Sequence, residues 1–114
     1  VKMYDEAFEG ENFWKPVHIS EESKSSCHLY LLRLNGKNEE ERNKCIEKMA
    51  ELGVATNVHY KPLPLLTAYK NLGFDISNYP QAYNMYKNEV TLPLHTLLTD
   101  EEVNYIISSM KKSV

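Results

Sequence analysis

The amino-acid sequence predicts an α+β domain, in which a small three-stranded, mainly antiparallel sheet carries helices on one face. Two observations favour this class. The 114-residue chain has room for one modest hydrophobic core. Short apolar runs typical of strands, at residues 27–34, 54–58 and 89–94, alternate with patterns typical of helices. We expect the first two strands to be parallel, with the third between them and antiparallel to both.

The first strand is predicted at residues 27–34, which read CHLYLLRL. The run is almost continuously apolar, as in a well-buried strand, although periodicity alone does not exclude a helix. The sheet face that carries Tyr30 is expected to need a cover from a neighbouring domain or a partner. Residues 11–26 show no regular pattern, and their end, SEESKSS, is expected to be a solvated polar loop.

The first main helix is predicted to begin after Asn38, a residue type that caps helices. Glu41 stands three residues later and completes a capping-box pattern. Gly53 stands where helices commonly end in a left-handed conformation. Apolar residues between these signals share one face at helical spacing. They are Cys45, Ile46, Met49 and Leu52.

The second strand ends at a turn that reads HYKP. Pro62 pushes Lys61 out of helical conformation and fixes this turn. Short helices are expected next, over Leu65–Leu72 and from near Asn78, where Pro80 is tolerated in the first turn.

The last helix has the strongest signals. Thr99 and Glu102 form a capping box, and Leu98 with Val103 forms a hydrophobic staple across it. An apolar stripe at helical spacing then predicts an amphipathic helix that lies on the sheet. The stripe consists of Val103, Ile106, Ile107 and Met110.

Composition excludes several classes of function. Hydrophobic residues make up 42% and charged residues 25%, as in an ordinary globular protein. The net charge is −3 and no face is basic, which argues against nucleic acid as a partner. No apolar run approaches the roughly 20 residues of a membrane span, and no targeting peptide is recognised. The two cysteines are expected to be reduced, as in a cytoplasmic protein. The two cysteines and four histidines have no metal-ligand spacing, so no metal site is predicted.

Known catalytic motifs are missing. The four glycines are isolated and each fits a turn or a helix end, so no phosphate-binding loop is formed. The sequence contains no GxSxG elbow, HExxH pair or Walker loop. These motifs therefore supply no catalytic and no cofactor-binding residue within this chain.

The candidate binding residues are His59, Tyr60 and Lys61, at the turn after the second strand. Histidine donates or accepts hydrogen bonds near neutral pH, and tyrosine offers a rigid hydroxyl to a polyol ligand. Lys61 suits a phosphate or a carboxylate. A purely structural role is the alternative, with His59 capping a strand end and Tyr60 packing on a nearby leucine.

Several motifs in order resemble the C-terminal segment of the DegT/DnrJ/StrS family of sugar-nucleotide aminotransferases. The stretches are GVATNVHYKPLPLLTAYKNLGF, then YPQAY, then VTLPLHTLLTDEEVNYI. They are similar to the family patterns GI-T-x-x-HY-x-P-L, FP-x-A and L-S-LP-L-x-x-x-LT-x-x-x-V-x-x-V-I. The resemblance covers Ser26 to Met110. Pro64 departs from the family, which often has histidine there, and Thr67 from a frequent proline.

The resemblance implies a fold-type I enzyme that uses pyridoxal 5'-phosphate. A large N-terminal domain would hold the cofactor and its lysine, and a small C-terminal domain would close over the active site. Residues 1–26 would then be the tail of an interdomain helix with an irregular lead-in, and residues 27–114 the small domain. The chain opens on Val1 without an initiator methionine, which fits a piece of a longer protein.

By this resemblance, His59 and Tyr60, with Lys61 beside them, would face the sugar of a keto-sugar nucleotide. The amino donor would be glutamate, the full-length enzyme would be a homodimer, and this chain alone would be inactive. Two alternatives stay open: a non-catalytic ferredoxin-like ligand-binding or regulatory module, and a relative that acts as a sugar dehydratase.

Overall fold

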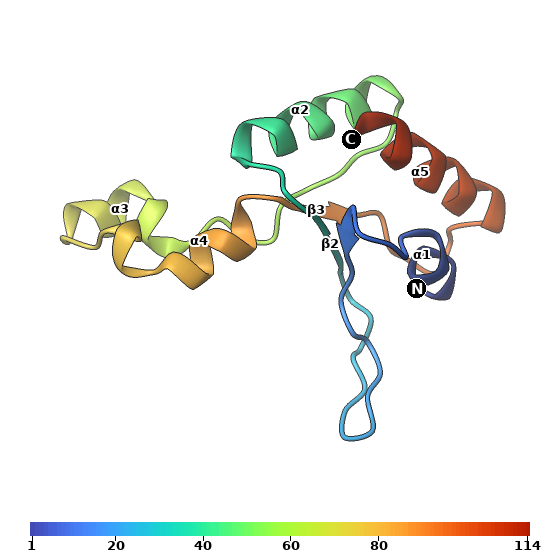
Figure 1. Ribbon diagram of the computed structural model, residues 1–114, viewed down its shortest axis with the longest axis horizontal. Coiled ribbons are helices and arrows are strands. Elements are labelled where there is room, and N and C mark those ends of the chain that lie inside the picture. Colours follow the sequence, from blue (N-terminus) through green and yellow to red (C-terminus); the bar gives the residue numbers. More distant parts are fainter.

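The computed structural model describes residues 1–114 and has the predicted α+β class (Figure 1). A three-stranded antiparallel sheet carries α1, α2 and α5 on one face, while α3 and α4 form a separate lobe at one end. The helices are α1 Lys2–Ala7, α2 Glu39–Glu51, α3 Thr67–Asn71, α4 Pro80–Tyr86 and α5 Asp100–Ser113. The strands are β1 Phe13–Trp14, β2 Tyr30–Leu34 and β3 Glu89–Leu92, and single 3-10 turns lie at Leu63–Leu65 and Ile76–Asn78.

The strands lie in the order β1-β2-β3, and both neighbouring pairs are antiparallel. The first and third predicted strands therefore form, and Leu32 lies opposite Val90 in their register. Both are shorter than predicted. Cys27 has a φ of 56°, which is left-handed and unsuited to a strand, so β2 begins only after it. Pro93 has no N–H and follows the last residue of β3.

The predicted second strand does not form, and this prediction was wrong. Only Asn57 pairs with β3, in an isolated antiparallel bridge to Thr91. Side chains take the place of the next ladder bond: the His59 N–H donates to Glu89 Oε2 at 3.0 Å, and the Glu89 carbonyl accepts from Arg42 Nη1 at 3.1 Å. The third predicted strand does lie antiparallel to both neighbours, but one of those neighbours is a single bridge.

The third strand of the sheet is β1, within a segment expected to be irregular. Phe13 pairs with Leu34 and Trp14 with Arg33, whose guanidinium lies 5.6 Å from the Trp14 ring centre. Two residues are too few to show the alternation by which strands are recognised. Residues 15–29 then project from the body as a hairpin, whose tip is exposed as predicted (Figure 1).

The hydrophobic core lies between the sheet and helices α1, α2 and α5. The prediction that Tyr30 needs a cover from outside was wrong, because strand alternation places it with Leu32 and Leu34 on the helix-covered face. The ring of Tyr4 on α1 lies 4.9 Å from that of Tyr30. The core consists of Tyr4, Phe8, Tyr30, Leu32, Leu34, Cys45, Met49, Val54, Val90, Leu92, Ile106 and Met110.

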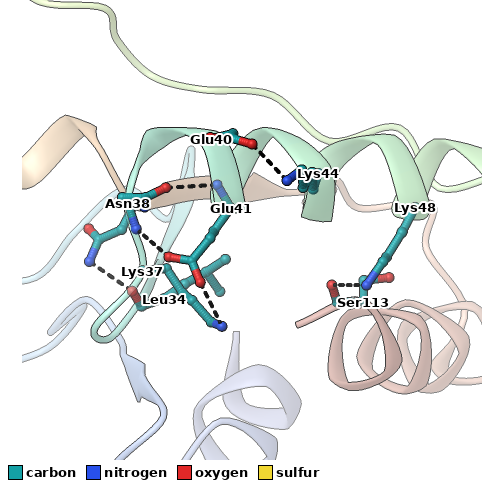
Figure 2. A network of polar contacts seen from close by, with 9 residues as sticks. Leu34, Lys37, Asn38, Glu40, Glu41, Lys44, Lys48 and Ser113 are labelled. Carbon is teal, nitrogen blue, oxygen red and sulfur yellow. Dashed lines mark hydrogen bonds and ion pairs between the residues drawn. The ribbon is translucent and has the colours of Figure 1, made fainter.

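Helix α2 begins with the predicted capping box. Asn38 Oδ1 accepts from the Glu41 N–H at 2.9 Å, and the Asn38 N–H donates to Glu41 Oε2 at 3.0 Å (Figure 2). Lys37 pairs with the same carboxylate at 3.2 Å. At the other end of the helix, Lys48 Nζ donates to the Ser113 carbonyl at 3.4 Å, which ties α2 to the end of α5 (Figure 2).

The buried face of α2 matches the prediction except at its end. Cys45 and Met49 are buried, and Ile46 packs against the core. Leu52 is 38% exposed instead, because it caps the helix and the chain turns away there. Arg42 is buried although three glutamates precede it in the first turn of the helix. Its guanidinium lies 4.7 Å from the ring centre of Tyr86 and donates to that residue's carbonyl.

Helix α5 confirms its prediction. Thr99 Oγ1 accepts from the Glu102 N–H at 3.2 Å, and the Glu102 side chain accepts from the Thr99 N–H at 2.8 Å. Ile106 and Met110 are buried in the core, and the other apolar residues of the stripe and staple pack against it. None of the helices combines the length and the apolarity that crossing a membrane requires.

The helices of the lobe formed by α3 and α4 differ in detail from those predicted. The helix predicted over Leu65–Leu72 is split into a 3-10 turn and the short helix α3. Helix α4 begins at Pro80 rather than near Asn78, with the proline in its first turn as predicted. Apolar side chains remain exposed here, including Leu72 at 74% and Met85 at 57%. The lobe therefore has no core of its own.

Candidate functional site

The predicted binding residues lie in a turn at the outer edge of β3, which we call the His59 turn (residues 57–62). Its first residue is held by two backbone bonds: the Asn57 N–H donates to the Thr91 carbonyl at 3.2 Å, and the Thr91 N–H returns a bond of 2.7 Å. At its far end Pro62 has a φ of −57° and starts the 3-10 turn. The turn is thus fixed at both ends.

The His59 side chain is joined to two polar residues of β3. Its Nδ1 lies 2.9 Å from Thr91 Oγ1, and that hydroxyl donates to Glu89 Oε1 at 2.5 Å. The other carboxylate oxygen of Glu89 accepts the backbone N–H of His59 at 3.0 Å. These three bonds form a closed ring, which we call the His59–Thr91–Glu89 ring.

Glu89 is an unusual residue for this position, because only 4% of its surface is exposed. Burial disfavours the charged carboxylate and raises the pKa of Glu89. Hydrogen bonds from Thr91 and from the His59 N–H oppose this shift, as does the positive charge of Arg42. Both oxygens of this buried carboxyl group are therefore hydrogen-bonded, as burial of a polar group requires.

Tyr60 and Lys61 point their functional groups to solvent. Tyr60 is 73% exposed, and its ring stands at 85° to that of His59 with centroids 4.7 Å apart. Lys61 is exposed and forms no ion pair within the chain. The structure therefore brings the three predicted residues together at one turn, with a free phenol and a free ammonium group.

Sequence reasoning missed Glu89 and Thr91 as partners of this turn. The run EVTLPL was interpreted as a strand without regard to its polar members. Its alternation could have indicated them, because Val90 and Leu92 point to the core while Glu89 and Thr91 share the opposite face.

An open apolar hollow of about 380 Å³ lies beside the His59 turn. It includes Pro62 of the turn itself and Pro64, which departs from the family pattern. Three aromatic rings from the α3 and α4 lobe also line it. The lining residues are Pro62, Leu63, Pro64, Tyr69, Phe74, Tyr79 and Ala82.

The residues of this chain do not by themselves form a site for pyridoxal phosphate. A lysine that binds this cofactor covalently is activated by desolvation. No lysine of this chain is buried. The glycines, which a phosphate cradle needs in a cluster, lie far apart in the sequence.

Comparison with known proteins identifies the family. The sequence model of the DegT/DnrJ/EryC1/StrS aminotransferase family matches residues 1–111. A UDP-4-amino-4,6-dideoxy-N-acetyl-beta-L-altrosamine transaminase from Helicobacter pylori is 31% identical over 110 residues, which are 96% of this chain and 29% of that protein.

Solved structures agree with this match. The presumed sugar aminotransferase Spr1654 from Streptococcus pneumoniae, in its PMP form, is 55% identical, with a TM-score of 0.95 over 98% of this chain and 28% of that one. Its PLP form gives a TM-score of 0.92 at 53% identity, over 99% and 30%. PseC from Helicobacter pylori, an aminotransferase involved in the biosynthesis of pseudoaminic acid, is 30% identical, with a TM-score of 0.85 over 98% and 30%.

The chain spans less than a third of the length of these relatives, between 28% and 30% of each. The resemblance predicted from Ser26 to Met110 is confirmed, and the family match also includes α1 and β1. The chain therefore belongs to the DegT/DnrJ/EryC1/StrS aminotransferase family.

Proposed function

We propose that this chain is the C-terminal part of a sugar aminotransferase that depends on pyridoxal phosphate. The parent enzyme would transfer an amino group from glutamate to a keto-sugar nucleotide, for the synthesis of a modified sugar or a cell-surface polysaccharide. The observation that carries this proposal is the TM-score of 0.95 against 28% of a longer aminotransferase chain. Family membership favours this function over a non-catalytic ferredoxin-like module.

The proposal assigns separate tasks to separate parts of the parent enzyme. Residues 27–114 are the small domain that closes over the active site, and residues 1–26 lead into it from an interdomain helix. The cofactor acts as an electron sink during amino transfer, and its lysine belongs to a domain outside this chain. The parent works in the cytoplasm as a homodimer.

Within this arrangement the His59 turn binds the sugar substrate. His59 and Tyr60 offer hydrogen bonds to hydroxyl groups, and Lys61 offers a positive charge to a phosphate. Support for these roles comes from the free phenol of Tyr60 and the ammonium group of Lys61, which has no partner in the chain. The apolar hollow beside the turn would exclude water from one side of the ligand.

The first test separates the chain from the cofactor domain. When the 114-residue chain is mixed with pyridoxal phosphate and reduced with borohydride, we expect only the scattered lysine labelling that an unrelated control protein gives. A stoichiometric adduct at one lysine, located by mass spectrometry, would contradict the assignment of the cofactor site to another domain. In parallel, the full-length enzyme should convert keto-sugar nucleotides with glutamate. Loss of a sugar hydroxyl without amino transfer would indicate a dehydratase instead.

A further inference from the structure

The protons in the His59–Thr91–Glu89 ring can be assigned by counting donors and acceptors. Above its raised pKa, Glu89 is an ionised carboxylate that only accepts, and a hydroxyl has one proton to give. Thr91 gives this proton to Glu89 Oε1 at 2.5 Å. The contact of 2.9 Å between Thr91 Oγ1 and His59 Nδ1 then needs a proton on the nitrogen. In a neutral imidazole, Nε2 is consequently an acceptor.

We propose that Glu89 and Thr91 are positioning residues that hold His59 as its Nδ1–H tautomer, so that Nε2 accepts a hydrogen bond from a hydroxyl of the sugar substrate. The choice of a sugar as ligand rests on the function proposed above. The choice of tautomer rests only on the ring itself.

Burial makes the ring rigid enough for this task. Glu89 is 4% and Thr91 5% exposed, so water does not compete for their hydrogen bonds. Backbone bonds from Asn57 and His59 to the same two residues fix the imidazole relative to β3. Orientation and tautomer of a histidine are commonly set in this way, by the partner of its other nitrogen.

The Nε2 atom of His59 is available to a ligand. His59 is only partly buried, and Nε2 makes no hydrogen bond within the chain. An acceptor at this point selects for a hydroxyl or amine donor and disfavours a phosphate oxygen, which is itself an acceptor. His59 therefore suits the sugar ring, and no phosphate of the substrate is expected at Nε2.

An isosteric change at Glu89 should reverse the direction of the hydrogen bonds in the His59–Thr91–Glu89 ring. In Glu89→Gln the amide oxygen would keep the bond from the His59 N–H, which leaves the amide N–H₂ facing Thr91. The amide would donate to Thr91, Thr91 would donate to His59 Nδ1, and the proton of the imidazole would move to Nε2. A purely structural role of Glu89 predicts no such exchange.

The test uses the full-length enzyme labelled with ¹⁵N-histidine, at pH 8, where imidazole groups are ordinarily neutral. Long-range ¹H–¹⁵N spectra distinguish the two tautomers, and the His59 signals are those lost in His59→Gln. We expect Nδ1–H in the wild type and in the matched control Thr91→Ser, and Nε2–H in Glu89→Gln. The Nε2–H tautomer in the wild type, or no change in Glu89→Gln, would overturn the positioning role.

Kinetic measurements test whether Nε2 contacts the sugar, independently of the tautomer. For the half-reaction with the keto-sugar nucleotide, kcat/KM should fall about tenfold in Thr91→Val, as for one lost hydrogen bond, and recover in Thr91→Ser. If the spectra agree but Thr91→Val leaves this half-reaction unchanged, Nε2 does not contact the sugar and the proposal fails. If the enzyme accepts no sugar nucleotide while the spectra agree, the proposed function fails and the tautomer assignment stands.

Discussion

The two faces of the sheet are buried by different means. The face that carries Tyr30, Leu32 and Val90 is covered by three helices, and its side chains are held by close packing. The opposite face carries Glu89 and Thr91, which are almost as inaccessible but are held by hydrogen bonds to one turn. Packing is non-directional, whereas a hydrogen-bonded ring fixes the orientation of each group. The first face therefore stabilises the domain, and the second determines how His59 is presented.

The largest effect is expected on the helix-covered face. Ile106→Ala removes a side chain that is 5% exposed and should lower the free energy of unfolding by about 2–5 kcal/mol, because a cavity forms in the core. Leu97→Ala is the matched control: Leu97 is 84% exposed, so the change should stay within about 0.5 kcal/mol. Denaturant titration measures both. Equal stability of the two variants would mean that α5 docks only within the intact parent protein.

An intermediate effect is expected on function at the opposite face. His59→Ala and Tyr60→Phe should reduce kcat/KM of the full-length enzyme for the keto-sugar half-reaction by the equivalent of about 1–3 kcal/mol each, because each loses a hydrogen bond to the ligand. The half-reaction with glutamate should change less, since this small donor does not fill the sugar subsite. The cofactor spectrum follows both half-reactions separately.

Two outcomes would contradict the assignment of His59 and Tyr60 to sugar binding. Equal losses in both half-reactions would indicate that the residues position the cofactor. Loss of stability without a change in kcat/KM would indicate a structural role for the His59 turn. Tyr60→Phe is the more informative change for the second point, because the Tyr60 ring is 73% exposed and its hydroxyl forms no bond within the chain.

The smallest effect is a dependence of stability on pH. Burial raises the pKa of Glu89 above the ordinary 4.5, against the opposing influence of Thr91, the His59 N–H and Arg42. Arg33 lies opposite in the register, but its guanidinium is bonded to groups of residues 84 and 88. Between pH 4.5 and the raised pKa, the folded chain holds more protons than the unfolded chain. The stabilisation that the folded chain gains from protonated Glu89 is therefore complete below pH 4.5. It is lost as the pH rises through the raised pKa of Glu89.

Denaturant titrations of the wild type and of Glu89→Gln across this range measure the effect, since glutamine does not titrate. The free energy of unfolding of the wild type, relative to the variant, should fall as the pH rises from 4.5 and then become constant. A difference that instead increases with pH would mean that the hydrogen bonds to Glu89 outweigh its burial.

The elements with local signals were predictable from the sequence. Both capping boxes, at Asn38 and at Thr99, involve side chains only three residues apart, and both form. The predicted strand before His59 fails for a reason that no local pattern contains, because the ladder bond is replaced by Glu89, thirty residues away in sequence.

Long-range contacts also explain what the sequence did not reveal about the site. The turn itself was recognised from His59, Tyr60 and Lys61, but its partners lie in a strand that is distant in sequence. Arg42 stands among glutamates and resembles a solvated residue. Its burial depends on the carbonyl groups of Tyr86 and Glu89, whose positions only the folded chain defines.

The position of β3 at the edge of the sheet has a consequence for solubility. An open strand edge invites pairing with a second molecule and leads to aggregation. Here Arg42 binds the outward carbonyl of Glu89, Asn57 pairs with both backbone groups of Thr91, and the Tyr4 hydroxyl donates to the Pro93 carbonyl at 2.7 Å. Pro93 has no N–H to offer. The contacts along this edge, including the Asn57 pair that holds the His59 turn, therefore deny a template to an incoming strand.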